Sequence, residues 1–574
     1  MYPPLRPLVL CAALPCCGWL SAQDLGQVGK QKPFTLSGGM NAYGALYTTD
    51  LNNPRMSPFT WGVNGRMTIG IYDLQIPLSF IFSEKEREFR QPFNQYGISP
   101  RYKWATAHIG HRTMHFSELT MSGQRFLGGG LELTPKKFRF AAMYGQLRRE
   151  IFADTLTEAI VEAAFQRTGM AAKVGVGTQA NHVDLVLFRA KDKYDELDLK
   201  RGLYGDAQPE ENLVVGIESA YVIRKNLQLA VDLAGSLHNV GVLPATREGS
   251  FAELGNKYDS FLFNVDPRTR RGTAVKAGLS YNLKGTTFSV NYDRIDPLFR
   301  TLGNYYFMND LENYRAGFAT GLFKQKVRVA GSLGLQTNDL AKSLEARTRR
   351  TIGSANLTYN SGKAFTTSLG WSNFEANLRS AYEAAGSDTI RLRQVSDNIT
   401  LSNSLRLRNT ATGITRTLDL SLSYQDFKNE GYPGQGTANT VTWSGSLGYR
   451  QRNKARAFDW GARATASVFE NAGNGRTRYG ASLNARKGFR DNRTGVNARA
   501  AFYLNRGEQY RGSTTLVANA GVDQRLGRQH RVGLGLNYNG RSTNDRFENS
   551  QYQLRVQATY AVEFLPPQRK TAAP

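Results

Sequence analysis

The stretch YQLRVQATYAVEF, residues Tyr552 to Phe564, decides the fold class. Its odd and even positions differ in character, and the period is two. One face carries Tyr552, Leu554, Val556, Ala558, Tyr560, Val562 and Phe564, and the other carries Gln553, Arg555, Gln557, Thr559, Ala561 and Glu563. Because successive side chains of a β-strand point to opposite faces, this pattern predicts a strand between an apolar and an aqueous medium. Soluble strands usually have about five or six residues. A tilted strand needs about 9 to 11 to cross a bilayer, so this one is long enough.

The same alternation recurs along the chain. Further examples are the apolar sets Leu227/Leu229/Val231/Leu233, Val327/Val329/Leu333/Leu335, Leu418/Leu420/Leu422/Tyr424 and Val532/Leu534/Leu536/Tyr538, each interleaved with small or polar residues. Short turn-like connections alternate with long ones, such as residues 85–101, 239–269 and 376–395. Short turns at one rim and long loops at the other are typical of outer-membrane barrels.

Composition is consistent with such a barrel. The chain has 574 residues with 40% hydrophobic and 11% aromatic residues, and no stretch after residue 22 offers the roughly 20 continuous apolar residues of a spanning helix. A soluble chain of this length would divide into several domains, but no linker interrupts the hairpin pattern. A string of β-sandwiches would show shorter strands and no alternation of short and long connections.

We therefore predict an all-β chain in which residues 34–564 form a single large antiparallel transmembrane β-barrel. The pattern places 25 strands, and a single-chain barrel needs an even number. A further strand near Thr113 to Met121 would give 26, which we prefer, and inward folding of Arg87 to Gly123 would give 24. Either ring is wider than the 16 to 18 strands that leave an open aqueous channel, so we do not expect an empty pore.

The two ends of the chain lie outside this barrel. Residues 1–22 have the layout of an export signal, with Arg6, an apolar core and a small-residue cleavage site at Leu20-Ser21-Ala22. Residues 23–33 form a short N-terminal periplasmic segment, and residues 565–574 a C-terminal tail. All three cysteines, at positions 11, 16 and 17, lie in the signal, so the exported chain has no thiol and no cysteine-based metal site.

These features resemble those of Gram-negative outer-membrane β-barrel proteins. Within that class, Phe93-Asn94-Gln95-Tyr96-Gly97-Ile98-Ser99-Pro100, followed by Lys103-Trp104, resembles large uncharacterised barrels of Bacteroidota. The resemblance implies a location in the cell outer membrane after cleavage of the signal. Such barrels often end at the terminal aromatic residue of the last strand. This chain differs, because ten residues follow Phe564.

Charge carries most of the functional information. Loss of residues 1–22 removes one arginine and no acid, which leaves 72 basic against 47 acidic side chains. Ten arginines lie on the polar phase of their strands and are predicted to face the lumen: Arg328, Arg406, Arg408, Arg450, Arg463, Arg478, Arg486, Arg499, Arg525 and Arg555. Asp184, Glu218 and Asp232 occupy corresponding positions in the N-terminal half. Guanidinium groups stay charged and bind phosphate or carboxylate. The alternative is that these arginines cross-link strands through Asp419, Asp523 and Glu563.

The region Arg87 to Gly123 is the predicted constriction or plug. Its candidate residues are Arg87, Arg90, Arg101, Lys103, His108, His111, Arg112 and His115. On a strand, only His111 and His115 share a face, about 13 Å apart, so we predict no metal site and no other cofactor.

Two functions follow from these features. The first is a porin-like channel or transporter whose arginine-rich lumen favours anionic groups. The second is a structural barrel subunit of an outer-membrane assembly or secretion complex with a partner in the lumen. We expect contacts with membrane lipid and lipopolysaccharide, an anionic solute for the first function, a protein capping or filling the lumen for the second, and no nucleic acid. We predict no enzyme, because the sequence has no Gly-x-Ser-x-Gly, His-Glu-x-x-His or phosphate-loop motif.

Overall fold

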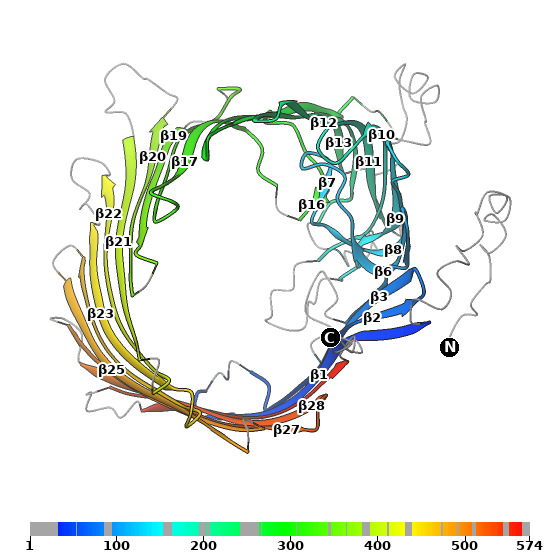
Figure 1. Ribbon diagram of the computed structural model, residues 1–574. Coiled ribbons are helices and arrows are strands. Elements are labelled where there is room, and N and C mark those ends of the chain that lie inside the picture. The colour runs from blue at the N-terminus through cyan, green and yellow to red at the C-terminus, as the bar shows by residue number, and fades with distance from the viewer. Residues whose placement is uncertain are drawn as a thin grey trace.

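The strands form one continuous antiparallel sheet that closes on itself, as the computed structural model shows (Figure 1). The structure describes residues 33–564 except 53, 55, 85–93, 153–162, 195–203, 205–206, 242–262, 264, 266, 306, 343–345, 363, 381–390, 410–411, 431–438, 472–473, 491–492, 508–511 and 544–549. The predicted signal and tail therefore lie outside the described residues, as do Arg87 and Arg90. Among the residues described, no helix is long and apolar enough to cross a membrane.

The strands follow one another as neighbours. The first half comprises β1 (Phe34–Thr49), β2 (Phe59–Ile71), β3 (Leu74–Ser83), β4 (Gln95–Ile98), β5 (Arg101–Tyr102), β6 (Ala105–Thr113), β7 (Met121–Ser122), β8 (Arg125–Leu133), β9 (Phe138–Arg148), β10 (Gln166–Gly177), β11 (His182–Lys193), β12 (Glu210–Arg224), β13 (Leu227–Val240), β14 (Arg270–Leu283), β15 (Thr286–Ile295), β16 (Gly303–Asn304) and β17 (Leu311–Leu322). The second half comprises β18 (Val327–Asn338), β19 (Ala346–Asn360), β20 (Phe365–Ser380), β21 (Arg391–Asn409), β22 (Ile414–Glu430), β23 (Thr440–Asn453), β24 (Phe458–Asn471), β25 (Asn474–Phe489), β26 (Thr494–Gly507), β27 (Ser513–Leu526), β28 (His530–Thr543) and β29 (Gln551–Phe564).

The ring has 26 strand positions, as predicted. β1 pairs with β2 on one side and with β29 on the other, which closes the sheet. β4 and β5 together fill one position, because both lie between β3 and β6. β7 and β16 are not part of the ring and pair with each other in a separate two-stranded sheet.

The predicted location of the twenty-sixth strand was wrong. The extra strand is β4 with β5, not Thr113 to Met121, and the chain turns at Lys103 into β6. The sequence pattern hides this strand because Pro100 has no N–H for the ladder and divides it into two short pieces. Residues 114–124 instead fold into the ring. The structure therefore has 26 strands and also an inward segment, which is shorter than the Arg87 to Gly123 segment of the 24-strand alternative.

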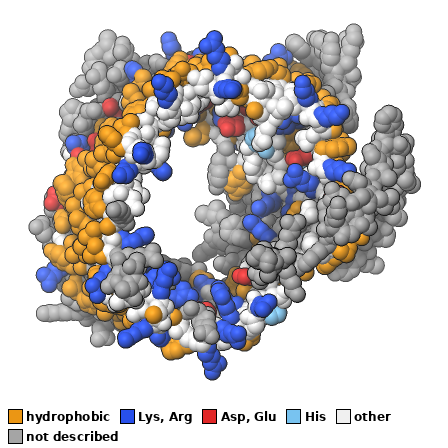
Figure 2. Space-filling model, in the orientation of Figure 1, with side chains coloured by type: hydrophobic (Ala, Val, Ile, Leu, Met, Phe, Trp, Pro, Cys, Tyr) orange, Lys and Arg blue, Asp and Glu red, His pale blue; other side chains and the backbone are white. Residues whose placement is uncertain are grey.

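Alternation along the strands separates two surfaces. In β11, exposed and buried residues alternate. Val183 and Leu185 are exposed, whereas Asp184 and Val186 are fully buried. The exposed partners belong to the outer surface, where hydrophobic side chains form a broad band (Figure 2). This arrangement confirms the period-two prediction, since each strand turns one face outward and one face to the lumen.

The short connections have the conformations that tight hairpins need. Between β14 and β15 only Lys284 and Gly285 are unpaired, with φ values of 49° and 88°. Positive φ at both central residues is typical of a type I′ turn, whose twist matches that of the strands. Tyr72, between β2 and β3, and Lys136, between β8 and β9, lie in two other short connections and also have positive φ. We refer to this edge as the short-turn rim and to the opposite edge as the long-loop rim.

Two connections at the long-loop rim fold into the ring. The first inward loop, residues 114–124, follows β6 and contains β7, and the second, residues 296–310, follows β15 and contains β16. Figure 1 shows both beside the wall of β8 to β13, away from the wall of β19 to β28. An opening remains on that other side in Figure 2. The described residues thus fill the ring along one side, which differs from the expectation that no passage is left.

Candidate lumen site

Three acidic residues form a row on the inner face of the covered wall. Asp184 in β11, Glu218 in β12 and Asp232 in β13 lie directly opposite one another in register. We call them the acid row. Such adjacent carboxylates repel one another unless cations lie between them. The row therefore needs positive partners from neighbouring strands.

Two cations supply this compensation. Arg139 in β9 donates to both oxygens of Asp184, at 2.8 and 3.1 Å from Nε and 2.8 Å from Nη2. Lys173 in β10 lies 3.7 Å from Asp184 and 3.3 Å from Glu218. Gly175, opposite Asp184, leaves the space that the carboxylate occupies, because a Cβ there would overlap Asp184 Oδ1. Asp184 is completely buried, so its contacts with the two cations are shielded from water, and the network joins β9, β10, β11 and β12.

The first inward loop binds to the same network. Lys173 Nζ donates to the carbonyl oxygen of Phe116 at 2.6 Å, and the backbone N–H of Leu119 donates to Asp232 at 3.3 Å. The exposed carboxylate of Glu118 lies 2.6 Å from Lys276 of β14. This hydrogen bond lowers the pKa of Glu118. The contact is therefore fully present at pH values above the ordinary pKa of a carboxyl group, and it weakens only as the pH falls through the lowered pKa.

The second inward loop is fixed to the first by Asn304. Its side-chain oxygen accepts from the N–H of Ser122 at 2.6 Å, and its amide donates to the carbonyl of Glu118 at 2.7 Å. Asn212 of β12 secures the same loop to the wall, because it donates to the carbonyl of Arg300 and accepts from the N–H of Leu302. The two loops and the wall therefore form one hydrogen-bonded unit.

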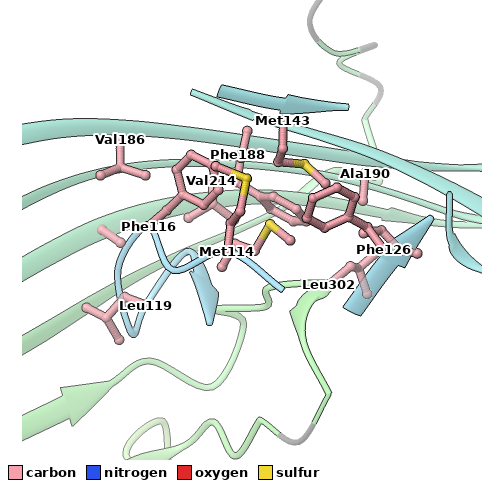
Figure 3. Packing of buried hydrophobic residues seen from close by; sticks show 14 of the residues in the cluster. Met114, Phe116, Leu119, Phe126, Met143, Val186, Phe188, Ala190, Val214 and Leu302 are labelled. Atoms are coloured by element: carbon pink, nitrogen blue, oxygen red, sulfur yellow. The ribbon is translucent and has the colours of Figure 1, made fainter. Parts of the chain in front are cut away.

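Apolar packing stabilises this unit. Phe116, Leu119 and Met121 of the first loop have no exposed surface, and they belong to one buried cluster with Phe188 of β11 and Phe299 of the second loop. Figure 3 shows Phe116, Leu119 and Phe188 of this cluster. Burial of each large side chain contributes roughly 1.5 to 3 kcal/mol relative to exposure. The loops thus belong to the folded core of the protein and narrow the ring on this side.

A second ion-pair network lies where the covered wall reaches the long-loop rim. Arg167 donates to Asp192 at 2.7 Å and also pairs with Glu210. Arg148 lies 3.1 Å from Asp192, and His238 lies 3.1 Å from Glu210. These contacts join the ends of β9 to β13. The charged side chains at this part of the rim therefore neutralise one another.

The ten arginines predicted for the lumen lie in β18, β21, β23 to β27 and β29. Their positions alternate along the strands with those of exposed apolar side chains. Arg478, for example, precedes Tyr479, which is 51% exposed. The in-register neighbours are mostly uncharged: Gly448 and Ser482 flank Arg463, and two asparagines flank Arg499. Arg525 faces another cation, Arg531. We call this surface the arginine wall.

Few acids compensate the arginine wall. The side chain of Arg408 lies outside the described residues. Among the other nine arginines and the described acids, only Arg486 has an ion pair, at 4.0 Å from Asp523. The cross-links expected through Asp419 and Glu563 do not form within the described part of the chain. Positive charge on this side is therefore largely unneutralised, unlike that on the covered wall.

The predicted constriction residues are distributed over several positions. Arg101 and Lys103 lie in β5 and the turn after it, at the short-turn rim. His108, His111 and Arg112 belong to β6 in the wall, where Arg112 donates to Ser79 at 2.8 Å. Of the described candidates, only His115 lies in an inward loop.

His115 has a serine and a carboxylate nearby. Its Nδ1 lies 3.1 Å from Ser122 Oγ, whereas its Nε2 lies 3.9 Å from Glu218, which is beyond hydrogen-bond distance. Glu218 is already engaged by Lys173. We interpret this group as a support for the first inward loop.

Within the described part of the chain, one set of side chains has metal-ligand chemistry. His182, Asp184 and Glu218 bring ligand atoms within 4.8 Å of one another. Arg139 already binds the carboxylate of Asp184, and Lys173 binds that of Glu218, so a metal ion would have to compete with both cations. Two fixed cations at these carboxylates oppose a third, so the donor set does not fit a metal site.

Sequence reasoning missed the second inward loop, which it treated as an ordinary long connection. The signal was present in Phe299, Leu302 and Phe307, since an exposed loop has no reason to carry three large apolar residues within nine positions. No periodicity marks them, and their partners in the first loop are more than 170 residues away.

Comparisons with known proteins give similarities of architecture. No protein-family model matches the chain, and no curated protein matches it. The translocation pore of the P pilus usher PapC is 11% identical over 92% of this chain and 99% of that chain, with a TM-score of 0.36. An E. coli P pilus tip assembly intermediate, PapC-PapD-PapK-PapG, is 11% identical over 94% of this chain and 62% of that chain, with a TM-score of 0.42. OccK11 of Pseudomonas aeruginosa is 13% identical over 70% of this chain and 96% of that chain, with a TM-score of 0.27. At these values the similarities assign neither a family nor an activity.

Proposed function

We propose that the protein is an outer-membrane channel or transporter whose lumen selects anionic groups. The observation that carries this proposal is the arginine wall, with its largely unpaired guanidinium groups beside the opening. A lumen lined by one sign of charge attracts counter-ions of the other sign and repels like ions. Because the inward loops cover the opposite wall, a solute would pass along the arginines.

The location follows from the outer surface. A broad apolar band on a closed barrel suits the hydrocarbon of a bilayer, and the expected signal at residues 1–22 would deliver the chain to the outer membrane. Loop lysines and arginines would then contact lipopolysaccharide phosphates. The proposal includes no catalytic step.

Ion selectivity of the purified protein tests the proposal. In planar bilayers under a tenfold KCl gradient, we expect the reversal potential to move toward the chloride limit, which is about 59 mV for a perfectly selective pore. Absence of conductance, or movement toward the potassium limit, would contradict an anion-selective lumen.

The second candidate, a structural barrel with a partner in the lumen, is favoured by the size of the opening left by the one-sided filling (Figure 2). Purification in mild detergent distinguishes the two candidates. A stable stoichiometric protein partner together with a non-conducting barrel supports the second, and an isolated conducting barrel supports the first.

A further inference from the structure

The inward loops and the wall of β14 to β18 line an open cavity of about 820 Å³ that faces the lumen. This volume is within the range of roughly 300 to 1,000 Å³ found for small-molecule sites. The cavity is separate from the arginine wall, and the interactions described above do not account for it.

One side of the cavity is polar and electrically balanced. Lys276, Asp293, Asn313 and Gln336 form a single row in register across β14, β15, β17 and β18. Lys276 is paired with Glu118 at 2.6 Å, and Asp293 accepts from Arg315 at 3.1 Å. Among the described residues, the amide of Gln336 has no hydrogen-bond partner. The row thus offers donors and acceptors without a strong net charge.

The other side is apolar and exposed. Tyr305 and Met308 of the second inward loop are 57% and 70% exposed, although this loop lies inside the ring. Phe307 lines the same cavity and packs against Phe299 with ring centroids 5.5 Å apart. Large apolar side chains facing an aqueous lumen gain stability only when a ligand covers them.

We propose that this cavity binds a sugar ring, and that the solute is an anionic oligosaccharide whose charged groups contact the arginine wall. The inference rests on the proposed anion-selective lumen. A sugar ring presents C–H faces that pack on Tyr305 and Met308, and hydroxyl groups that exchange hydrogen bonds with Gln336 and the carboxylates. A small inorganic anion would use none of the apolar surface, and a purely apolar ligand would leave the amide of Gln336 unpaired.

Binding calorimetry on the detergent-solubilised barrel tests the cavity independently of conduction. Tetragalacturonate is the probe, maltotetraose is the neutral sugar and tricarballylate is the anion without a sugar ring. We expect tetragalacturonate to bind tightest, maltotetraose more weakly and tricarballylate weakest. Tricarballylate binding as tight as that of tetragalacturonate would overturn the inference.

Variants locate the site. Tyr305→Ala and Gln336→Ala should each weaken tetragalacturonate binding about tenfold, because each removes one contact of about 1.4 kcal/mol. Tyr479→Ala, which removes an exposed tyrosine in the outer phase of β25, should leave binding unchanged. Equal affinities of the Tyr305 and Tyr479 variants would refute the assignment. An anion-selective barrel that fails to bind tetragalacturonate refutes the sugar site alone, and a cation-selective barrel refutes the proposed function.

Discussion

Simultaneous replacement of Arg463, Arg478 and Arg499 by glutamine is expected to reduce the chloride-to-potassium permeability ratio about tenfold. Each exposed charge within a few ångströms of a passing ion changes its energy by about 0.5 to 1 kcal/mol, and three such changes exceed the 1.4 kcal/mol that corresponds to a factor of ten. These arginines have uncharged neighbours in register, so no acid is released to offset their loss. Reversal potentials in planar bilayers measure the effect.

The matched control removes three arginines near short connections: Arg456, Arg490 and Arg528. Net charge falls by the same amount, but these residues follow or precede strand ends and do not line the middle of the arginine wall. The control should retain most of the selectivity. Equal losses in the two triple variants would show that overall charge, and not the arginine wall, sets the selectivity.

Asp184→Ala should lower the free energy of unfolding by about 3 kcal/mol, because it leaves the half-buried guanidinium of Arg139 and the ammonium of Lys173 without their shared carboxylate. Loss of the same carboxylate also weakens the support of the first inward loop, since Lys173 holds Phe116. Urea unfolding of the barrel in detergent measures the difference. Folded and unfolded barrel are distinguished by their electrophoretic mobility, which for the folded barrel changes on heating.

Asp523→Ala is the matched control for stability. Asp523 also belongs to a lumen-phase ion pair, but its side chain is 32% exposed and its partner Arg486 lies 4.0 Å away and is 66% exposed. Such a pair contributes about 0 to 1 kcal/mol. Asp184→Ala is therefore expected to unfold at clearly lower urea than Asp523→Ala. The same midpoint for both variants is incompatible with a network at the acid row that is shielded from water.

The barrel could be predicted because its physical cause is local. Alternation within one strand, as in Tyr552 to Phe564, requires no knowledge of any other strand, and β29 begins at Gln551 and ends at Phe564. The strand count followed from parity, although Pro100 concealed the strand that completes it. Local pattern thus determined the fold but not the course of every strand.

The covered side of the lumen could not be predicted because its causes are relations between distant residues. The acid row needs the registers of β11 to β13, and its compensation by Arg139 comes from a strand two positions away. Asp184, Glu218 and Asp232 were recognised as lumen residues, but nothing local indicated that they would bind Lys173 and the first inward loop. The lumen arginines could be predicted from the sequence because the prediction depends only on the phase within each strand and not on partners.

The most direct test of which face meets water uses two adjacent residues of β25, Ser482 and Leu483. Leu483 is 62% exposed on the apolar band, and Ser482 lies opposite Arg463 in register. The chain has no cysteine after position 17, so Ser482→Cys and Leu483→Cys each introduce the one thiol of residues 18–574. In proteoliposomes, a membrane-impermeant thiol reagent should label the cysteine at 482 rapidly and the cysteine at 483 slowly. Faster labelling at 483 than at 482 would contradict the barrel orientation on which the proposed function depends.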